Sequence, residues 1–301
     1  MSDLRLGTIL TAIVTPFDAE GAIDEDAFVG LMRHLADNGS DGFVVAATTG
    51  EAATLTDDEQ LRLIELAVSE RPSGKSIVAG AGTNDTRHAV FLTEQATELG
   101  ADALISVTPY YNRPSPLGLT RHYEAVAAAT DKPILLYNIP SRTGTNVGPE
   151  LLAELAQIEH IDAVKQANPD ELQLIDGLEL YAGDDSSLAK VLDLGGAGGV
   201  CVSSHIVGSE MKEMADEPGR RGEIDASLKD VYEALFLAPS PTCTKAALNL
   251  LGLRGGTTRL PIVDATPQET EAVRAMLVRH GLLDDDLASV GEAGPAGARA
   301  A

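Results

Sequence analysis

The stretch PILLYNIPSRTG, from Pro133 to Gly144, begins as an apolar run and ends in small and polar residues. Its first half, PILLYN (Pro133–Asn138), has the composition of a β-strand that is covered on both faces. A second apolar run, IDAVKQA (Ile161–Ala167), carries a single lysine, Lys165, near its end. The two runs therefore predict two buried strands whose ends carry a phenol, Tyr137, and an amine.

An amine at the tip of a buried strand, with a phenol nearby, suits imine chemistry on a carbonyl substrate. Burial disfavours the charged form of a lysine, so the amine becomes nucleophilic near neutral pH. A phenol such as Tyr137 can then move protons to and from the imine. The ordinary interpretation of an isolated Lys165 is a lysine that caps a strand and extends its ammonium group to water. The surrounding sequence has to decide between the two.

The composition is that of an ordinary globular chain of 301 residues, with 44% hydrophobic and 23% charged residues. No run of about eighteen apolar residues is present, and the N-terminus MSDLRLG lacks the features of a secretory signal, so no membrane partner is expected. The formal net charge of −24 argues against nucleic acid as a partner. Cys201 and Cys243 are too few for a disulfide framework, which favours a reduced, cytoplasmic setting.

Apolar runs of strand length alternate with amphipathic segments along the chain. Their Val, Ile and Leu content, without clean alternation, fits parallel strands covered on both faces. The expected strands are Ile9–Val14, Gly42–Ala47, Ser76–Ala81, Ala103–Thr108, Pro133–Asn138, Asp162–Gln166, Leu178–Gly183 and Gly198–Ser203. The amphipathic segments that predict helices between them include Glu25–Asn38, Thr56–Ser69, Thr86–Leu99 and Leu117–Ala129.

Eight strands that alternate with helices favour a (β/α)₈ TIM barrel, here over residues 1–220. The alternative, a doubly wound open sheet, needs a glycine-rich phosphate loop after an early strand, and no GxGxxG spacing is present there. GGAGG (Gly195–Gly199) is expected to be a tight turn before the eighth strand. Further helices are predicted at Ser209–Glu217, Gly222–Ala238, Pro241–Leu251 and Pro267–His280. Residues 284–301, rich in Ala, Gly and acidic residues, are expected to form a flexible tail.

Five motifs occur in order along the chain: AATTGEAATL (Ala46–Leu55), VTPYYNRPS (Val107–Ser115), YNIPSRTG (Tyr137–Gly144), the strand lysine Lys165 and YAGDD (Tyr181–Asp185). In this order and spacing the chain resembles the class I pyruvate aldolase superfamily of N-acetylneuraminate lyase, and most closely its dihydrodipicolinate synthase branch. The resemblance covers nearly the whole chain. It implies a C-terminal helical subdomain over residues 221–283 after the barrel, and a homotetramer built as a dimer of dimers.

The resemblance also implies a reaction. Members of this branch condense pyruvate with L-aspartate 4-semialdehyde to 4-hydroxy-tetrahydrodipicolinate, in the diaminopimelate route to lysine. Lys165 is expected to form a Schiff base with pyruvate, with Tyr137 as the general acid–base. Loss of a proton from the imine methyl group gives an enamine, whose carbon attacks the aldehyde, and cyclisation frees the lysine. The covalent imine makes any further cofactor unnecessary.

In a TIM barrel the active site lies at the carboxyl ends of the strands, where each of the five motifs falls. Thr48 and Thr49 follow the second strand, and their N–H groups and hydroxyls suit the carboxylate of pyruvate. A threonine-rich turn is the ordinary alternative. The resemblance implies that Thr48 relays protons between two tyrosines, and that Tyr111 crosses a dimer interface to complete the relay in the neighbouring subunit.

The second substrate is assigned through Arg142. A guanidinium binds a carboxylate bidentately, and the matching arginine of the family binds the carboxylate of aspartate semialdehyde. A surface arginine in a polar turn is the alternative. Gly183 and Val200 match positions whose backbone carbonyls line the substrate pocket in the family. Two neighbours depart from the family pattern: Ala47 replaces a usual glycine, and Gln166 replaces a frequent acidic residue.

Metal binding and feedback regulation receive less support. The six histidines show no metal-ligand spacing, so no metal is expected. Feedback-sensitive members of the family bind lysine in a cleft at the dimer interface. Asn84 and Tyr110 match that site, whereas Asp57, Gln60 and His88 depart from it. Weak or absent inhibition by lysine is therefore expected.

Two other functions remain open at this point. A close alternative is another pyruvate aldolase or keto-acid dehydratase that uses a different aldehyde, against which Arg142 and the paired tyrosines argue. An alternative of another class is a catalytically silent protein that binds small keto acids as a sensor. The presence of Lys165, Tyr137, Thr48 and Tyr111 together argues against such a sensor.

Overall fold

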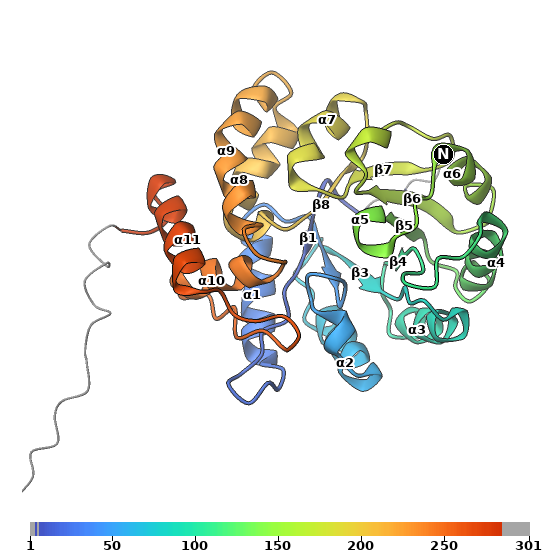
Figure 1. The fold of residues 1–301 in the computed structure, drawn as a ribbon, viewed down its shortest axis with the longest axis horizontal. Coiled ribbons are helices and arrows are strands. Elements are labelled where there is room, and N and C mark those ends of the chain that lie inside the picture. The colour runs from blue at the N-terminus through green and yellow to red at the C-terminus, as the bar shows by residue number, and fades with distance from the viewer. Residues whose placement is uncertain (1–3, 5, 285–301) are drawn as a thin grey trace, which may run out of the picture.

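Eight parallel strands form a closed barrel in the computed structural model, which describes residue 4 and residues 6–284 (Figure 1). Each strand pairs with the next along the chain, and β8 pairs with β1. The strands are β1 Ile9–Ala12, β2 Gly42–Val45, β3 Ser76–Gly80, β4 Ala103–Val107, β5 Ile134–Asn138, β6 Ile161–Gln166, β7 Glu179–Ala182 and β8 Gly198–Cys201. The predicted (β/α)₈ architecture is confirmed. The tail predicted over residues 284–301 lies, except for its first residue, outside the described part of the chain.

Most of the predicted strands extend one or two residues too far at their carboxyl ends. Ala46, directly after β2, has a φ of +51°, a left-handed conformation that ends the strand. After β8, the N–H groups of Val202 and Ser203 donate to the carboxylate of Asp185 at 2.9 and 2.7 Å instead of continuing the ladder. The strands end at these points because the backbone groups that follow bond to loop residues and not to the neighbouring strand.

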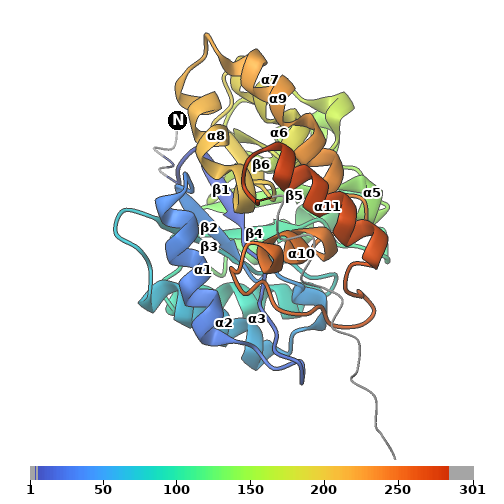
Figure 2. The same ribbon diagram turned by 90° about the vertical axis from the view of Figure 1, so that its left-hand side faces the viewer.

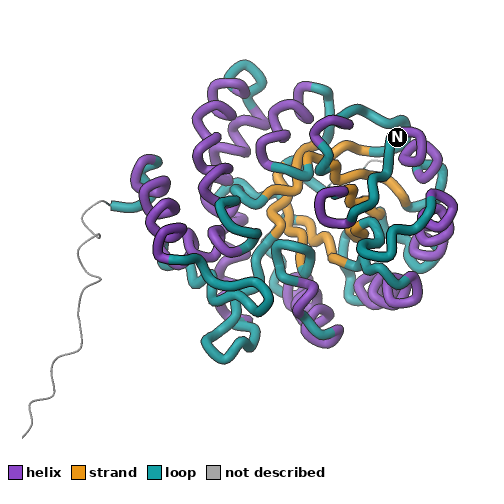
Figure 3. Tube along the Cα trace, viewed as in Figure 1, coloured by secondary structure: helices purple, strands orange, loops and turns teal. Residues whose placement is uncertain are grey.

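Helices surround the barrel on all sides, as the ring of purple tubes around the orange strands in Figure 3 shows. Their apolar faces pack on the outer faces of the strands, which explains why the strands read as continuous apolar runs. The helices are α1 Glu25–Asp37, α2 Asp57–Ser69, α3 Thr86–Glu98, α4 Pro116–Ala127, α5 Pro140–Thr143, α6 Pro149–Leu155, α7 Leu188–Asp193 and α8 Ser204–Asp216, with short 3₁₀ turns η1 Ala52–Thr54, η2 Pro169–Glu171 and η3 Asp185–Ser187.

One predicted helix begins in the wrong place. Helix α8 begins at Ser204, five residues before the predicted start at Ser209, and is interrupted at Val207, which has φ −123° and ψ 37°. Directly after the kink, Gly208 approaches the backbone so closely that a Cβ there would lie 2.2 Å from the carbonyl oxygen of Asn38. The glycine and the kink interrupt the helical period of the apolar residues, so the sequence does not predict the first turn of α8.

Three helices follow the barrel and make up a C-terminal helical region: α9 Arg221–Leu235, α10 Thr242–Leu250 and α11 Pro267–Arg279. Helix α9 packs against α8, and α10 packs against α8, α9 and α11 (Figure 2). The helices predicted here are present, and that residues 221–283 form a subdomain of their own stays a prediction. No helix in the described residues combines the length and the apolar character that a bilayer span requires.

A small cluster of inward-facing residues fills the inside of the barrel. Side chains alternate between the two faces of a strand, so every second residue points inward. Leu10, Val44, Val78 and Leu135 are among the members of this inner cluster, and Tyr137 belongs to it as well. The phenol of Tyr137 therefore stands inside the barrel, at the end of β5.

Candidate active site

The pairing of β5 with β6 brings Tyr137 and Lys165 side by side. The register aligns Tyr137 with Lys165, and Lys165 in turn with Tyr181 of β7. The Nζ atom of Lys165 lies 4.1 Å from the centroid of the Tyr137 ring, and each of the two residues is only 6% exposed. An amine and a phenol, separated by 28 residues in the sequence, thus stand within reach of one carbonyl group.

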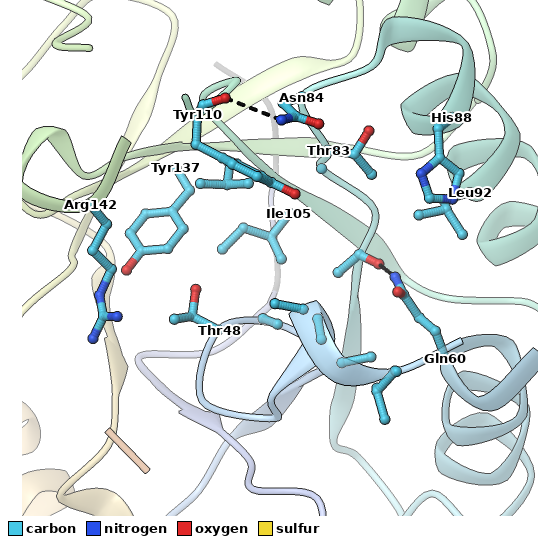
Figure 4. Close-up of a pocket in the computed structure, with 18 of the residues that line it drawn as sticks. Thr48, Gln60, Thr83, Asn84, His88, Leu92, Ile105, Tyr110, Tyr137 and Arg142 are labelled. Atoms are coloured by element: carbon cyan, nitrogen blue, oxygen red, sulfur yellow. Dashed lines mark hydrogen bonds between the residues drawn. The ribbon is translucent and has the colours of Figure 1, made fainter. Parts of the chain in front are cut away.

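A cavity of about 450 Å³ opens beside Tyr137 (Figure 4). Thr48 and Arg142 line it together with Tyr137, and Figure 4 shows the hydroxyl of Tyr137 on the side of these two residues. Arg142 lies on the short helix α5, directly after β5. No ion pair joins Arg142 to a carboxylate within residues 4 and 6–284, so its guanidinium is available for a ligand carboxylate.

Five of the predicted site residues do not line this cavity: Thr49, Tyr111, Lys165, Gly183 and Val200. Thr49 and Val200 are 5% and 1% exposed, and Val200 packs inside the barrel. Gly183 lies against β6, where an added Cβ would stand 2.6 Å from the Cβ of Ala167, so only glycine allows β7 to end there. Lys165 does not line the cavity itself, but its Nζ lies over the ring of Tyr137, which does. The substrate roles expected for Gly183 and Val200 stay predictions.

The loop that carries Thr48 and Thr49 is closed by its own backbone. The N–H of Glu51 donates to the carbonyl oxygen of Thr48 at 3.1 Å, and the hydroxyl of Thr15 donates to the carbonyl oxygen of Gly50 at 2.7 Å. Glu51 itself has a φ of +56°, a left-handed conformation that few residues other than glycine adopt. These two hydrogen bonds therefore hold the loop that carries the two threonines in one conformation.

Neither departure from the family pattern touches the reacting groups. The positive φ after β2 falls on Ala46 and not on Ala47, so an alanine at 47 fits the loop. The side chain of Gln166 accepts a hydrogen bond from Nδ2 of Asn138 at 3.0 Å and is 2% exposed. Since neighbouring residues of a strand point to opposite faces, Gln166 faces away from Lys165.

Tyr110 and Tyr111 differ in their surroundings. Tyr110 lines the cavity, and its carbonyl oxygen accepts a hydrogen bond from Nδ2 of Asn84 at 3.3 Å (Figure 4). Tyr111 does not line the cavity of its own chain, is 90% exposed and has a φ of +72°. A large aromatic ring is thus held out into solvent by a loop of unusual backbone conformation.

The cavity continues from Tyr110 to helices α2 and α3, where the three departures from the family's lysine site lie. The Nε2 atom of His88 lies 2.9 Å from a carboxylate oxygen of Asp57. Gln60 donates from Nε2 to the carbonyl oxygen of Gly80 at 2.7 Å (Figure 4). All three side chains therefore bind partners within the chain, and weak inhibition by lysine stays a prediction.

The two aspartates of YAGDD received no role from the sequence; neither lines the cavity, but Asp184 lies near the charges of Lys165 and Arg142. Burial raises the pKa of the Asp184 carboxyl, and the nearby charges of Lys165 and Arg142 oppose this rise. Asp185 is 3% exposed and holds the chain after β8 through the two N–H groups described above. The available signal was two successive acidic residues at the end of a buried strand, because buried carboxylates are rare and need partners.

Two buried histidines serve structural contacts. His205 accepts a hydrogen bond at Nε2 from the N–H of Val14 at 3.2 Å, and its Nδ1 lies 2.7 Å from the carbonyl oxygen of Val202. The Nδ1 atom of His122 lies 3.0 Å from the hydroxyl of Thr86. Burial lowers the pKa of each imidazole to about 4. In the described part of the chain, no three His, Cys, Asp or Glu residues are grouped so as to hold a metal ion.

Comparison with known proteins gives one consistent result. The chain matches the model of the dihydrodipicolinate synthetase family over residues 5–280. It is 42% identical over 295 residues to the 4-hydroxy-tetrahydrodipicolinate synthase of Moorella thermoacetica, covering 93% of this chain and 100% of that relative. The solved structure of dihydrodipicolinate synthase from Cyanidioschyzon merolae with lysine bound is 39% identical, with a TM-score of 0.89 and coverage of 92% and 99%. That of a dihydrodipicolinate synthase from Bacillus anthracis is 38% identical, with a TM-score of 0.87 and coverage of 91% and 98%.

Proposed function

The chain belongs to the dihydrodipicolinate synthetase family, and we propose how its residues perform the reaction of that family. It is a lyase of lysine and diaminopimelate biosynthesis that condenses pyruvate with L-aspartate 4-semialdehyde to 4-hydroxy-tetrahydrodipicolinate. The observation that carries the mechanism is the contact between Lys165 and Tyr137 at the ends of β6 and β5.

The first step is the formation of an imine between Lys165 and pyruvate. The Nζ atom attacks the keto carbon, and the oxygen of the resulting carbinolamine leaves as water after it receives a proton. Tyr137 supplies this proton, because its ring already contacts Nζ and the barrel interior keeps bulk water away. The carboxylate of pyruvate binds to the loop of Thr48 and Thr49, whose N–H groups and hydroxyls suit an anion.

The second step joins the two substrates. Tyr137 takes a proton from the methyl group of the imine and leaves an enamine, whose terminal carbon attacks the aldehyde. Arg142 binds the carboxylate of aspartate semialdehyde, since its guanidinium lines the cavity and has no carboxylate partner in the described residues. The amine of the substrate then attacks the imine carbon, which closes the ring and frees Lys165. The imine serves as the electron sink, so the reaction uses no other cofactor.

The complete site needs a second copy of the chain. Tyr111 stands 90% exposed at the rim of the cavity, and Phe91 and Leu117 are 40% and 66% exposed on the neighbouring helices. Exposed apolar groups of this size favour an interface between subunits. Tyr111 of one subunit then reaches the site of the next and passes protons to Thr48 and Tyr137. The resulting dimer pairs into a tetramer, and the enzyme works in the cytoplasm.

Borohydride reduction in the presence of pyruvate tests the mechanism most directly. The reagent reduces an imine to a stable amine, so the protein gains the mass of a reduced pyruvyl group, and peptide mapping places the group on Lys165. A folded Lys165→Ala variant serves as the control and gains no mass. Added mass on another lysine, or none at all in the folded wild-type protein, would contradict the proposed mechanism. A coupled assay with the downstream reductase then checks aspartate semialdehyde as the second substrate.

A further inference from the structure

The carboxylate of Glu51 points away from the site loop and into the C-terminal helical region. Glu51 follows Thr49 by two residues, but its side chain is 2% exposed and lies 2.6 Å from Nζ of Lys245 on α10. Its second oxygen accepts a hydrogen bond from the N–H of Arg259 at 3.0 Å. The substrate loop is therefore bound, through one side chain, to two residues close to the end of the described chain.

Lys245 is as deeply buried as its partner. Its side chain is 2% exposed, donates to the carbonyl oxygen of Thr257 at 2.6 Å and stands 4.4 Å from the centre of the Phe17 ring. Burial lowers the pKa of Lys245, and the carboxylate of Glu51 opposes this lowering. A lysine placed in this way is held in one position by an ion pair, a carbonyl group and an aromatic ring.

Arg259 binds the far end of the same loop. One Nη atom donates to the carbonyl oxygen of Thr54 at 3.0 Å, and the guanidinium pairs with Glu59 at the start of α2. Burial is only partial here, but the pairing lowers the pKa of Glu59 to about 2. Lys245 and Arg259 together hold both ends of the short segment from Glu51 to Thr54.

Stability alone does not account for this arrangement. A buried ion pair often contributes nothing net to folding, because desolvation of the two charges offsets their attraction. Glu51 also adopts a left-handed backbone conformation, which is unfavourable for a residue other than glycine. Strain of this kind persists where the surroundings fix it, and here the strained N–H is the one that binds the carbonyl oxygen of Thr48. The geometry thus fixes the position of the two threonines.

We propose that Glu51 and Lys245 are positioning residues for the carboxylate of pyruvate, acting through the backbone of Thr48 and Thr49. This inference rests on the proposed function of the two threonines. The C-terminal helical region then contributes to substrate binding, because α10 supplies the cation that holds the substrate loop in position. The effect is specific for pyruvate, since Arg142 binds the second substrate and touches neither residue.

The test is the double variant E51Q/K245M, which removes both charges and leaves no unpaired charge in the interior. Borohydride trapping of the imine is measured against pyruvate concentration, together with the KM of each substrate and the melting temperature. We expect the half-saturating pyruvate concentration to rise about tenfold, because misplacement of binding groups by a fraction of an ångström has effects of this size. The KM for aspartate semialdehyde should stay within about twofold of the wild type, and a purely structural role would not separate the two substrates.

The matched control is Arg279→Met, which breaks an ion pair with Asp230 between α11 and α9, away from the loop. It should leave the half-saturating pyruvate concentration unchanged. An unchanged value in a folded double variant overturns the inference, whereas wild-type protein that traps no pyruvate overturns the proposed function instead. If the double variant does not fold, Glu51→Asp decides the matter: it keeps the charge opposite Lys245 but shortens the side chain that joins the loop to α10 by one methylene group. Unchanged pyruvate saturation in that variant also overturns the inference.

Discussion

Arg142 is the residue on which the choice of the second substrate depends. It lines the cavity beside Tyr137, and no carboxylate of the described chain pairs with it. A bidentate guanidinium–carboxylate contact contributes about 1.5–3 kcal/mol, which corresponds to roughly tenfold to a hundredfold in binding. The role of Arg142 can therefore be separated from the role of the lysine that binds pyruvate.

Replacing Arg142 by Met should raise the KM for aspartate semialdehyde by about tenfold to a hundredfold, because the carboxylate of this substrate loses its charged partner. Trapping of the pyruvate imine by borohydride should stay at the wild-type level. Arg87→Met is the control, since Arg87 is exposed on α3 and Asp85 is its one ion-pair partner among the described residues. A rise in the KM for pyruvate, with the KM for aspartate semialdehyde unchanged, would show that Arg142 binds pyruvate and that the proposed assignment is wrong.

At the scale of the elements, two histidines join parts of the barrel in their neutral form. His205 on α8 receives the N–H of Val14 just after β1, and His122 on α4 contacts Thr86 on α3. Burial lowers the pKa of both to about 4, below the ordinary value of about 6.5. The unfolded chain therefore takes up protons first as the pH falls. The contribution of these two groups to the stability of the fold is complete above about pH 6.5 and is lost as the pH falls from there to about 4.

From pH 7 to pH 5 we expect the free energy of unfolding to fall by roughly 2 kcal/mol for each of the two histidines. Urea denaturation at several pH values measures this fall. In the variant His205→Gln this fall in the free energy of unfolding should be smaller by the roughly 2 kcal/mol that His205 contributes. The variant His34→Gln, on the outer helix α1, should keep the full fall. A pH dependence that is identical in the wild type and in His205→Gln would show that His205 takes no part in it.

At the scale of the whole molecule, the exposed ring of Tyr111 makes the site a product of two subunits. Two inactive variants, Tyr111→Phe and Lys165→Ala, should regain activity when they are mixed under conditions that exchange subunits. Half of the randomly mixed dimers pair the two variants, and each of these has one complete site, so about a quarter of the wild-type activity is expected. Activity measured before and after exchange checks this.

The matched control mixes Tyr137→Phe with Lys165→Ala. Both residues belong to one site of one chain, so every site in the mixed dimer carries a defect and no activity should return. If the Tyr111→Phe mixture behaves like this control, Tyr111 acts within its own chain and the shared site is wrong.

The barrel could be predicted from the sequence because its signals are local. Each buried strand is an apolar run, and the residues at or shortly after the ends of the runs, such as Tyr137, Thr48 and Arg142, fall at one end of the barrel by the geometry of the fold. What the sequence did not contain is register: only the structure aligns Tyr137 with Lys165. The first turn of α8 was missed for a similar reason, because the kink at Val207 depends on packing against another element.

The contacts of Glu51 could not be predicted from the sequence, because its partners lie far away along the chain. A glutamate at the start of a helix is ordinarily exposed to solvent, where its charge stabilises the N-terminal end of the helix. Its actual partner Arg259 follows 208 residues later and Lys245 lies on α10, and no periodicity or spacing connects positions so far apart. Only the closing of the barrel and the packing of the last helices bring them together.

The distance along the chain between Glu51 and its partners also has a consequence for how the protein is made. A ribosome completes the loop of Thr48 and Thr49 early, and it emits Arg259 only after another 208 residues. In the later part of that interval the nascent chain contains Lys165 and Tyr137 but still lacks the cations that hold the loop. The growing chain therefore carries its reactive amine before the last helices supply the two cations that hold the substrate loop.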